Sequence, residues 1–491
     1  MIDRIPLEIL LHCLSYLPLN EKLECLRVNK STYNVIHTSD ALYESVTITN
    51  LEDFTNMHTF FTKYKELSKH VKKLHISDTT LDVNTYMALP ALFPNVKDFS
   101  FIDTDNPERD YDDKKVCAAF KPWAETLLSL QEFGTPVAAF SLLANVACPQ
   151  LRNLSLNMIG MEDEETKFAL YDYLENCPNV RLLDLKYLNT TIDHMEQIHD
   201  HLPNLEVLSL TQVGLPENDS DEDPPNQAEK LETVFISDFT VVTDFDGWLL
   251  YMALKYPNLK NLVVGKALDM YDEEVAFEGD YQWGLLELVS TNSKLELFSP
   301  QCLQLPPIAF KKMDAAGIKL KKIELSILAE ETFPLLMQSQ QIHSLTSLTI
   351  SNTSYSSMTY RNKSKFHQDL KKIKNLKHFR INQSKEEVNS PEDNRVPLDD
   401  LLKVLPSLES MQMDFFTLVI SRKSKKPFNT KLKKLVLEEV YVEALAVKGQ
   451  ENWKQKSKDL LQELLPNTDI EYRELGDTPE LEEYSHLLQF R

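Results

Sequence analysis

The feature that most constrains this chain is a short phrase that recurs from residue 70 onward. It consists of a small residue or proline followed by L-x-x-L-x-L. A unit of about 25 residues cannot bury its own apolar face, so neighbouring copies must stack and share one core. The clear copies are VKKLHI (71–76), VKDFSF (96–101), LRNLSL (151–156), VRLLDL (180–185), LEVLSL (205–210), LETVFI (231–236), LKNLVV (259–264), LKKIEL (320–325), LTSLTI (345–350), LKHFRI (376–381), LESMQM (408–413) and LKKLVL (432–437), with weaker copies near Leu130–Phe133 and Leu295–Phe298.

The phrase and the segments between its copies have different periods. The last residues of each phrase alternate apolar and polar, which predicts a short strand. The intervening segments carry apolar residues three and four apart, as at Phe366, Leu370 and Ile373, which predicts amphipathic helices. Several of these helices end before a proline, such as Pro178, that opens the next unit. The sequence therefore predicts an α/β fold: a right-handed solenoid with a parallel inner sheet and outer helices.

The first forty residues have a different character. The segment IPLEILLHCLSYL at 5–17 predicts an amphipathic helix, with Pro6 suited to its first turn and Pro18 at its end. Two further short helices follow. Three short helices make a very small core, because domains below about 40 residues seldom fold well alone. A partner that covers the surplus apolar surface is one explanation, and an ordinary helical cap on the following domain is the other.

This N-terminal stretch resembles the F-box, and the rest of the chain resembles the leucine-rich-repeat class found after many F-boxes. The F-box pattern is matched by Ile5–Leu10, by Leu17-Pro18 and by Leu26–Lys30. The chain departs from that pattern at Ile5, at Asn29 and at Tyr33, where leucine, cysteine and tryptophan are usual. The resemblance implies a module that binds the adaptor Skp1, with contacts from Ile5, Pro6, Leu7, Glu8, Ile9, Leu10, Leu14, Leu17, Leu23, Leu26, Val28 and Lys30.

The repeats also depart from their class. The third position after the last strand leucine is usually Asn or Cys, whose side chains form a ladder of hydrogen bonds to the backbone. Because most of these positions are apolar here, we expect this ladder to be absent and the curve to be less regular. The residues at this position are Ile159, Leu188, Val213, Phe239, Leu328, Phe416 and Val440.

The resemblance implies a division into an F-box at 1–40, a linker and cap at 41–69, a solenoid of about 13–15 irregular repeats at 70–475 and a tail at 476–491. It implies a substrate-recognition adaptor of a Skp1–cullin–F-box ubiquitin ligase, which reaches cullin and RING subunits through a Skp1-like adaptor. The alternatives are a scaffold that binds Skp1 without directing ubiquitination and a cryptic enzyme. No catalytic residue or cofactor is expected.

Polar residues that flank the strand leucines are expected to line the inner sheet surface, where they would contact an unknown client protein. No single charge sign dominates among them, which favours a protein or peptide over a polyanion. The candidate client contacts are Asn153, Ser155, Asp184, Lys186, Ser209, Thr211, Glu324, Arg380 and Gln412.

The composition disfavours several classes of partner and binding site. A net charge of −23 disfavours nucleic acid as a partner, and 10 glycines among 491 residues disfavour phosphate-cradling loops. Six cysteines without C-x-x-C pairs indicate a reducing compartment, the cytoplasm or nucleus. The chain has neither a signal-peptide pattern nor an apolar run of about 18 residues, so no membrane association is expected.

The remaining motifs are weak. On the predicted helix in TIDHMEQIHDH, His194 and His201 share a face while His199 points away, so a solvated outer face is the better interpretation than a metal site. The segment from Asp103 lacks the Gly and Glu of a calcium loop. Gly279 and Gly284 lack the following Lys of a phosphate loop.

Three acidic insertions are expected at 103–115, 215–229 and 384–395. The second contains Ser220, whose acidic surroundings suit phosphorylation as well as a plain loop. The basic run at 422–434 is interpreted as a solvated connection, with a nuclear address or docking patch as the alternative.

Overall fold

The computed structural model describes residues 7–15, 17, 21, 24–25, 28, 30, 33, 42–77, 81–102, 113–161, 163–215, 226–241, 245–268, 274–275, 282–326, 329–351, 363–382, 395–420, 427–428, 430–444 and 453–473. The chain divides into two compact units, residues 1–214 and 215–491. No described helix is long and apolar enough to cross a membrane.

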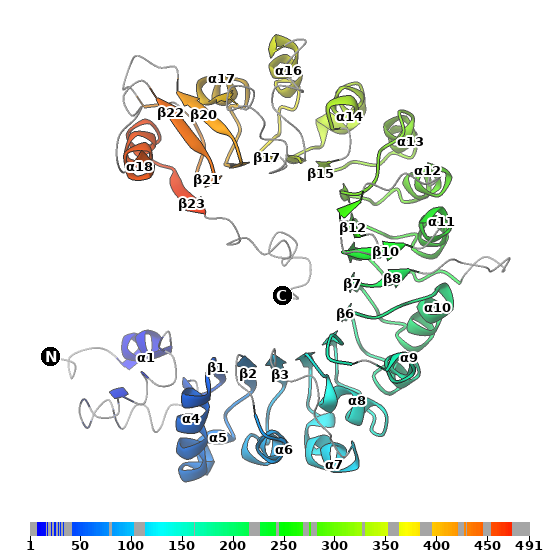
Figure 1. Ribbon diagram of the computed structural model, residues 1–491, viewed down its shortest axis with the longest axis vertical. Coiled ribbons are helices and arrows are strands. Elements are labelled where there is room, and N and C mark those ends of the chain that lie inside the picture. Colours follow the sequence, from blue (N-terminus) through cyan, green and yellow to red (C-terminus); the bar gives the residue numbers. More distant parts are fainter. Residues whose placement is uncertain are drawn as a thin grey trace. The chain divides into compact units, whose positions relative to one another are not determined.

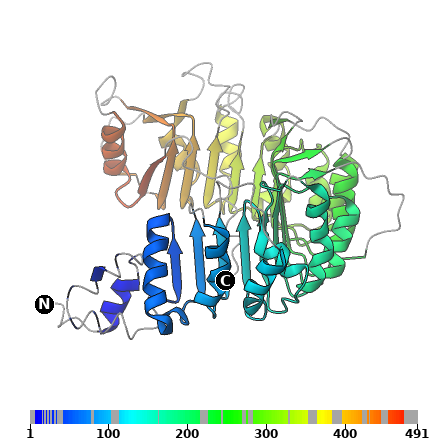
Figure 2. The ribbon, with the colours of Figure 1, turned by 60° about the horizontal axis from the view of Figure 1, so that its bottom comes forward.

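The first unit is built on a parallel sheet in which each strand pairs with the next one along the chain. Helices lie along one face of this sheet (Figure 1), and its strands run side by side in one direction (Figure 2). The strands are β1 Ser45–Ile48, β2 Lys73–Ser77, β3 Asp98–Ile102, β4 Ser129–Phe133, β5 Asn153–Asn157, β6 Leu182–Lys186 and β7 Val207–Thr211. The helices are α1 Leu7–Ser15, α4 Leu51–Lys63, α5 Lys65–Ser68, α6 Val83–Leu92, α7 Asp113–Ala124, α8 Val137–Leu143, α9 Glu164–Tyr173, η3 Leu174–Asn176 and α10 Ile192–His201.

The second unit repeats this arrangement with parallel pairing throughout its long sheet. Its strands are β9 Thr233–Ser237, β11 Asn261–Val264, β14 Leu297–Pro300, β15 Lys322–Leu325, β16 Ser347–Ile350, β17 His378–Asn382, β19 Ser410–Asp414, β21 Lys434–Glu438 and β23 Asp469–Arg473. Its helices are α11 Phe245–Lys255, α12 Gln282–Thr291, α13 Ala309–Ala315, α14 Ala329–Leu336, η4 Gln340–His343, α16 Lys363–Leu370, α17 Leu398–Val404 and α18 Trp453–Leu464.

Every clear leucine phrase forms a strand, and both weaker copies do so as well, as β4 and β14. Alternation places the phrase leucines between sheet and helices, where Leu154 and Leu156 are completely buried. The parallel α/β repeat architecture expected from the sequence is therefore confirmed. The last strand, β23, was not predicted, because Ile470 and Tyr472 stand where the phrase has leucines.

The turns after the strands explain the apolar residues that replace the usual Asn or Cys. In five repeats the residue directly after the strand has left-handed backbone, with φ between 48° and 64°: Tyr187, Gln212, Asp238, Phe415 and Glu439. This turn directs the next residue inward, so Leu188, Val213, Phe239, Phe416 and Val440 are buried. Ile159 differs, since it is 59% exposed, and Leu328 lies outside the described residues.

Several of these turns lead into a second short strand. The small strands are β8 Gly214–Leu215, β10 Phe239–Val241, β12 Ala267–Leu268, β13 Glu274–Val275, β18 Arg395–Pro397, β20 Thr417–Ile420 and β22 Tyr441–Ala444. In the second unit β10 pairs with β12, and β20 pairs with both β18 and β22. Val213, Phe239, Phe416 and Val440 thus begin or precede a further layer of short strands, which takes the place of a polar ladder in these repeats.

A different side-chain ladder exists at the opposite end of the strands, before them rather than after them. In five repeats an asparagine in the turn before the strand donates a side-chain hydrogen bond to a backbone carbonyl of the preceding repeat. The bonds run from Asn95 to Lys69 (2.7 Å), Asn179 to Pro149 (2.9 Å), Asn204 to Pro178 (3.3 Å), Asn258 to Glu229 (2.7 Å) and Asn375 to His343 (2.9 Å).

The predicted acidic insertions fall mostly outside the described residues, and Ser220 lies there too. The first insertion was predicted too long, since Asp113, Lys114 and Lys115 form the start of α7. The other two were too long as well: Ala228 donates its backbone N–H to the Lys255 carbonyl, and Arg395 begins β18. In the basic run, Lys433 and Lys434 are paired with Glu409 and Glu471.

Candidate functional site

Helix α1 separates its apolar residues onto an inner and an outer face. Leu14 is 3% exposed and Leu10 is half-buried, and these two residues lie four apart on one side of the helix. Ile9 and Cys13, also four apart, lie about 100° further round the helix, where Ile9 is 54% exposed and Cys13 is exposed. The amphipathic stripe predicted from the sequence is therefore only partly used for internal packing.

Beyond α1, two more large side chains of the N-terminal segment are open to solvent. Val28 is 54% exposed and Tyr33 is 42% exposed. Tyr33 was not among the predicted adaptor contacts, although its position in the F-box pattern marked it. Of the other predicted contacts, Leu17 is half-buried and Lys30 is exposed, whereas Leu7 and Glu8 are described only as part of the α1 backbone. Ile5, Pro6, Leu23 and Leu26 lie outside the described residues.

Polar residues form a row across the open face of the first unit, the sheet face away from the helices. Ser100, Gln131, Ser155, Asp184 and Ser209 occupy aligned positions on five neighbouring strands. Ser100 donates to Gln131 (Oγ to Oε1, 3.1 Å), and Ser155 donates to Asp184 (Oγ to Oδ2, 2.7 Å). The predicted client contacts Ser155, Asp184 and Ser209 are therefore brought together.

Part of this row is buried without a hydrogen-bond partner. The Asp184 Oδ1, Ser209 Oγ and Thr211 Oγ1 atoms have no partner within the part of the chain that the structure describes. Burial of unpaired polar atoms costs free energy, so such atoms favour a site that water or a bound polar group completes. Nearby, Lys186 aligns with Thr211, and its Nζ lies 5.1 Å from the centroid of the Phe133 ring. Asn153, half-buried, aligns with Leu182 at the other end of β5 and β6.

The predicted contacts of the second unit form a row of their own. Glu324, Thr349, Arg380 and Gln412 occupy aligned positions on β15 to β19. Glu324 is buried and accepts hydrogen bonds from Ser299 Oγ (2.8 Å), Ser351 Oγ (3.0 Å) and Gln301 Nε2 (3.3 Å).

At the far end of this row, Arg380 is paired with Asp414. The Nε and Nη2 atoms of Arg380 lie 3.1 and 3.0 Å from one Asp414 oxygen, and Gln412 donates to the other at 3.1 Å. Burial raises the pKa of the Asp414 carboxyl, and Arg380 opposes that shift. The row therefore offers both donors and acceptors, fixed by hydrogen bonds to one another.

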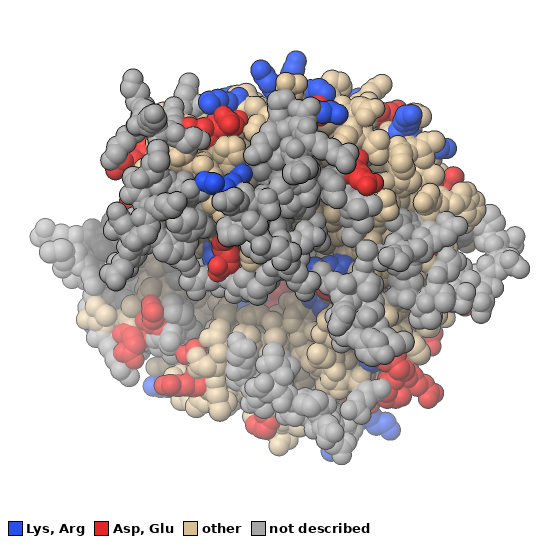
Figure 3. All heavy atoms as spheres, turned by 45° about the horizontal axis from the view of Figure 1, so that its top comes forward, with Lys and Arg blue, Asp and Glu red and all other residues tan. Residues whose placement is uncertain are grey.

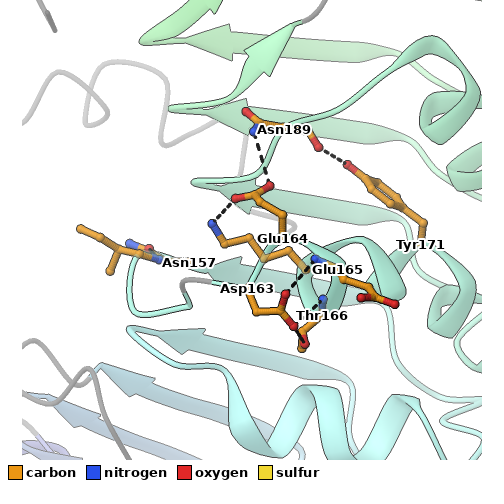
Figure 4. A network of polar contacts seen from close by, with 9 residues as sticks. Asn157, Asp163, Glu164, Glu165, Thr166, Tyr171 and Asn189 are labelled. Atoms are coloured by element: carbon orange, nitrogen blue, oxygen red, sulfur yellow. Dashed lines mark hydrogen bonds and ion pairs between the residues drawn. The ribbon is translucent and has the colours of Figure 1, made fainter. Parts of the chain in front are cut away.

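A cluster of polar side chains around α9 has a structural role (Figure 4). Asp163 caps the helix by accepting from the backbone of Glu165 and Thr166 (3.3 and 3.2 Å). Glu164 pairs with Lys167 (2.8 Å), and the Tyr171 hydroxyl donates to the Asn189 carbonyl (3.1 Å). These contacts join α9 to the turn after β6.

The histidine-rich helix α10 continues this structural cluster. The His194 side chain accepts from the Thr191 backbone (3.3 Å) in a capping box, and its ring stacks on Tyr171 with centroids 4.2 Å apart. Burial lowers the pKa of His194. Among the described residues, no group of three or more His, Cys, Asp or Glu side chains could hold a metal ion.

The segment that contains Gly279 and Gly284 and the calcium-like segment from Asp103 were also weak candidates. Gly284 lies in α12 and donates its backbone N–H to Asp246 Oδ1 at 2.7 Å, so it joins two helices. Gly279 and the segment from Asp103 lie outside the described residues.

Glu132 is a buried acidic residue that sequence reasoning did not identify. It stands at a core position of β4, aligned with Phe101 and Leu156. It accepts hydrogen bonds from the Tyr86 hydroxyl and from the first turn of α8, namely the N–H groups of Ala138 (3.3 Å) and Ala139 (2.6 Å). Burial raises the pKa of Glu132 to about 7 against the opposing effect of these hydrogen bonds. Its role is to cap α8.

Described residues of both charge signs lie on the surface of the protein (Figure 3). Basic and acidic side chains lie interspersed on the face shown in Figure 3. Charged side chains of neighbouring repeats also form exposed pairs, such as Lys260 with Glu232 at 2.6 Å and Lys321 with Glu296 at 2.7 Å.

The fold and these sites define a class: an α/β repeat protein of the leucine-rich-repeat type that carries a short N-terminal helical module with exposed apolar side chains. Comparison with protein-family models identifies that module, since residues 2–42 match the model described as "F-box domain". The chain therefore carries an F-box domain at its N-terminus. A search of curated proteins found no match.

Several solved structures resemble the chain weakly. An internalin from Listeria monocytogenes is 13% identical, with 70% of this chain and 84% of that chain covered and a TM-score of 0.32. A leucine-rich-repeat protein of Leptospira interrogans is 11% identical, with coverages of 80% and 99% and a TM-score of 0.31. The complex of Rad7 and Elc1 in yeast is 13% identical, with coverages of 87% and 90% and a TM-score of 0.42.

Proposed function

We propose that this protein is the substrate-recognition adaptor of a Skp1–cullin–F-box ubiquitin ligase. The observation that carries the proposal is that the F-box domain leaves Ile9 and Val28 more than half exposed, at 54% each. Exposed large apolar side chains in a module this small favour a protein partner. F-box domains in general bind Skp1-like adaptors, and that adaptor would link the chain to cullin and RING subunits.

The repeats would hold the client. The polar rows on the open faces supply hydrogen-bond donors and acceptors suited to a polypeptide. Ser155, Asp184, Ser209 and Thr211 are the favoured contacts in the first unit, because some of their buried polar atoms lack partners among the described residues. Asn153 and Lys186 border that row, and Glu324, Arg380 and Gln412 play the same part in the second unit.

The mechanism is one of proximity, and no residue of this chain performs acid–base chemistry in it. A client held on the repeats, close to a ubiquitin-conjugating enzyme brought by the cullin, presents its lysines at a high effective concentration. We place this function in the cytoplasm or nucleus, which suits a chain whose six cysteines are all free thiols.

Adaptor binding is tested by replacing the exposed apolar residues. The variant I9S/V28S is expected to lose about tenfold or more in affinity for a Skp1-type adaptor, because both apolar contacts disappear while internal packing is untouched. Co-purification and calorimetric titration measure this loss. The matched control is Leu51→Ser, which removes a side chain that is 59% exposed but lies outside the F-box match. Unchanged binding by I9S/V28S would refute the docking proposal.

Client turnover distinguishes a ligase subunit from a scaffold. In cells that carry I9S/V28S, a protein that binds the repeats should still be captured but should lose its ubiquitin chains and persist longer. Capture with unchanged ubiquitination in both the wild type and the variant would favour the scaffold that binds Skp1 without directing ubiquitination.

A further inference from the structure

One carboxylate on the open face of the first unit is only half satisfied. Asp184 is 7% exposed, and its Oδ2 atom accepts a hydrogen bond from Ser155 Oγ at 2.7 Å. Its other oxygen, Oδ1, is buried and has no hydrogen-bond partner in the described part of the chain. Burial of a carboxylate is costly unless donors or a cation accompany it. This position therefore favours a positively charged group that the described residues do not supply.

The nearest lysine along the strand is engaged by an aromatic ring. Lys186 follows Asp184 by two residues, so both side chains project from the same face of β6. The Lys186 Nζ atom lies 5.1 Å from the centroid of the Phe133 ring. Phe133 belongs to β4, which is two strands away from β6 in the order of pairing. Because a cation is stabilised over an aromatic face, Lys186 leans toward β4 and the Asp184 Oδ1 atom stays open.

Two hydroxyl groups close to Asp184 are unpaired as well. Ser209 aligns with Asp184 on the neighbouring strand and is completely buried, and Thr211 is 3% exposed. The Ser209 Oγ and Thr211 Oγ1 atoms have no hydrogen-bond partner among the described residues. Neighbouring strands lie about 4.8 Å apart, and residues two apart on one strand are separated by about 7 Å. The three open oxygen atoms therefore occupy one small area of the face, on β6 and β7.

The same two strands provide an apolar surface beside these oxygen atoms. Leu182 and Val207 are aligned, are 5% and 6% exposed, and each precede one of the polar residues, Asp184 and Ser209, by two positions. Side chains two apart on a strand share a face, so all four project away from the helices. Figure 1 shows α9 and α10 on the other side of β6 and β7. The area thus combines an apolar surface with a group of open acceptors.

We propose that this area, the Asp184 site, binds a lysine side chain of the client; it is formed by Leu182, Asp184, Val207, Ser209 and Thr211. The inference rests on the proposed function, because it names the residue type that the repeats recognise. A lysine ammonium has three N–H donors and no acceptor, which suits three open oxygen atoms. Its aliphatic stem would pack on the two apolar residues. A single open carboxylate oxygen suits this compact charge better than the two-pronged guanidinium of arginine.

Synthetic peptide libraries test the site on the full-length chain. Each library has one fixed central residue, which is lysine, acetyl-lysine or arginine, between randomised uncharged residues. The lysine library is expected to bind about tenfold or more tightly than the acetyl-lysine library, measured by fluorescence anisotropy, because acetylation removes the charge and keeps the stem. Equal binding of these two libraries would overturn the proposal and assign the open oxygen atoms to water. Equal or tighter binding of the arginine library would overturn the choice of an ammonium.

Variants of the chain separate this site from the general attraction of a protein of net charge −23 for cations. Asp184→Asn keeps an acceptor for Ser155 but removes the charge, so it should weaken binding of the lysine library by about tenfold. Glu165→Gln removes the same charge from an exposed position in α9 and is the matched control, with an expected change of less than about twofold. Equal losses in the two variants would show unspecific attraction and contradict the inference.

Lys186→Gln provides a change of the opposite sign. Removal of this positive charge, two residues from Asp184, should strengthen binding of the lysine library by about two- to fivefold, whereas damage to the fold would weaken it. Thermal unfolding of all three variants checks that the repeats remain folded. Unchanged or weaker binding by a folded Lys186→Gln variant would contradict the inference. These measurements use the chain without its adaptor, so their failure is distinguishable from a failure of adaptor docking by α1.

Discussion

At the scale of single residues, a glutamate occupies a position that the repeat reserves for an apolar side chain. Glu132 is 1% exposed, and its hydrogen bonds serve the first turn of α8, whose N-cap Pro136 provides no side-chain cap. The helix dipole and three hydrogen-bond donors favour the ionised carboxylate of Glu132 at this position. Desolvation outweighs them and keeps the pKa of this carboxyl near neutrality.

This raised pKa predicts a pH-dependent stability. The folded state holds the Glu132 proton up to about pH 7, whereas the unfolded chain releases it near its ordinary value of 4.5. The free energy of unfolding should therefore fall as the pH rises through this window, by about 3 kcal/mol for a shift of this size. Urea denaturation of the wild type at the two ends of the window measures the change.

Glu132→Gln supplies the comparison. Glutamine keeps the shape of the side chain and one hydrogen-bond acceptor, but it does not titrate. The variant should therefore lose this part of the pH dependence of stability. Its free energy of unfolding, relative to that of the wild type, should rise towards the alkaline end of the window. The same difference in denaturation midpoint at both pH values would show that Glu132 does not carry the effect.

Residue types also explain what the sequence could not predict. From the sequence alone, Glu132 is expected at the surface of a strand. Its buried hydrogen bond to Tyr86 could not be predicted, because Tyr86 lies 46 residues away in the chain. The asparagine ladder was missed because Pro-Asn pairs such as Pro178-Asn179 were interpreted only as turns that stop a helix. The exposure of Ile9, against the burial of Leu14, depends on how α1 packs, and periodicity cannot distinguish the two faces of a wide stripe.

At the scale of elements, neighbouring helices in the second unit approach closely at a glycine. A Cβ added to Gly284 in α12 would lie 2.4 Å from the Asp246 carbonyl oxygen and 2.9 Å from the Leu250 nitrogen, both in α11. Backbone atoms cannot move aside as a flexible side chain can. The same sequence feature that suggested a phosphate loop is therefore a helix contact.

Gly284→Ala should consequently destabilise the protein by about 1–3 kcal/mol, because overpacking forces α11 and α12 apart. Thermal and urea unfolding measure the loss. Thr291→Ala, at the other end of α12 and exposed, is the control and should change stability by less than about 1 kcal/mol. Equal stability of Gly284→Ala and the wild type would mean that the helices separate without cost.

Strands were the elements best predicted from the sequence, and the turns between them were the least. A leucine phrase specifies its strand locally, since alternation decides which side chains are buried. The residues with left-handed backbone after the strands, such as Gln212 and Glu439, are not glycines, so the sequence does not indicate their conformation. Their backbone is fixed by the burial of the next residue, which depends on the neighbouring repeat.

At the scale of the molecule, each repeat is stabilised mainly by the two beside it. Leu348 in β16 is fully buried, and its strand pairs with β15 and β17. Leu348→Ala should cost about 2–5 kcal/mol locally. Hydrogen exchange should increase in β15 to β17 and fall off with distance, leaving β2 and β3 unchanged. A uniform increase over the whole chain would instead indicate a single cooperative unit.

The asparagine ladder gives the chain a direction of assembly. Each asparagine reaches back to a carbonyl of the repeat made before it, as Asn204 does to Pro178 and Asn375 to His343. A polypeptide that leaves the ribosome from its N-terminus presents every acceptor before the donor that needs it. During translation, each new repeat can therefore form its asparagine hydrogen bond to a repeat that is already present.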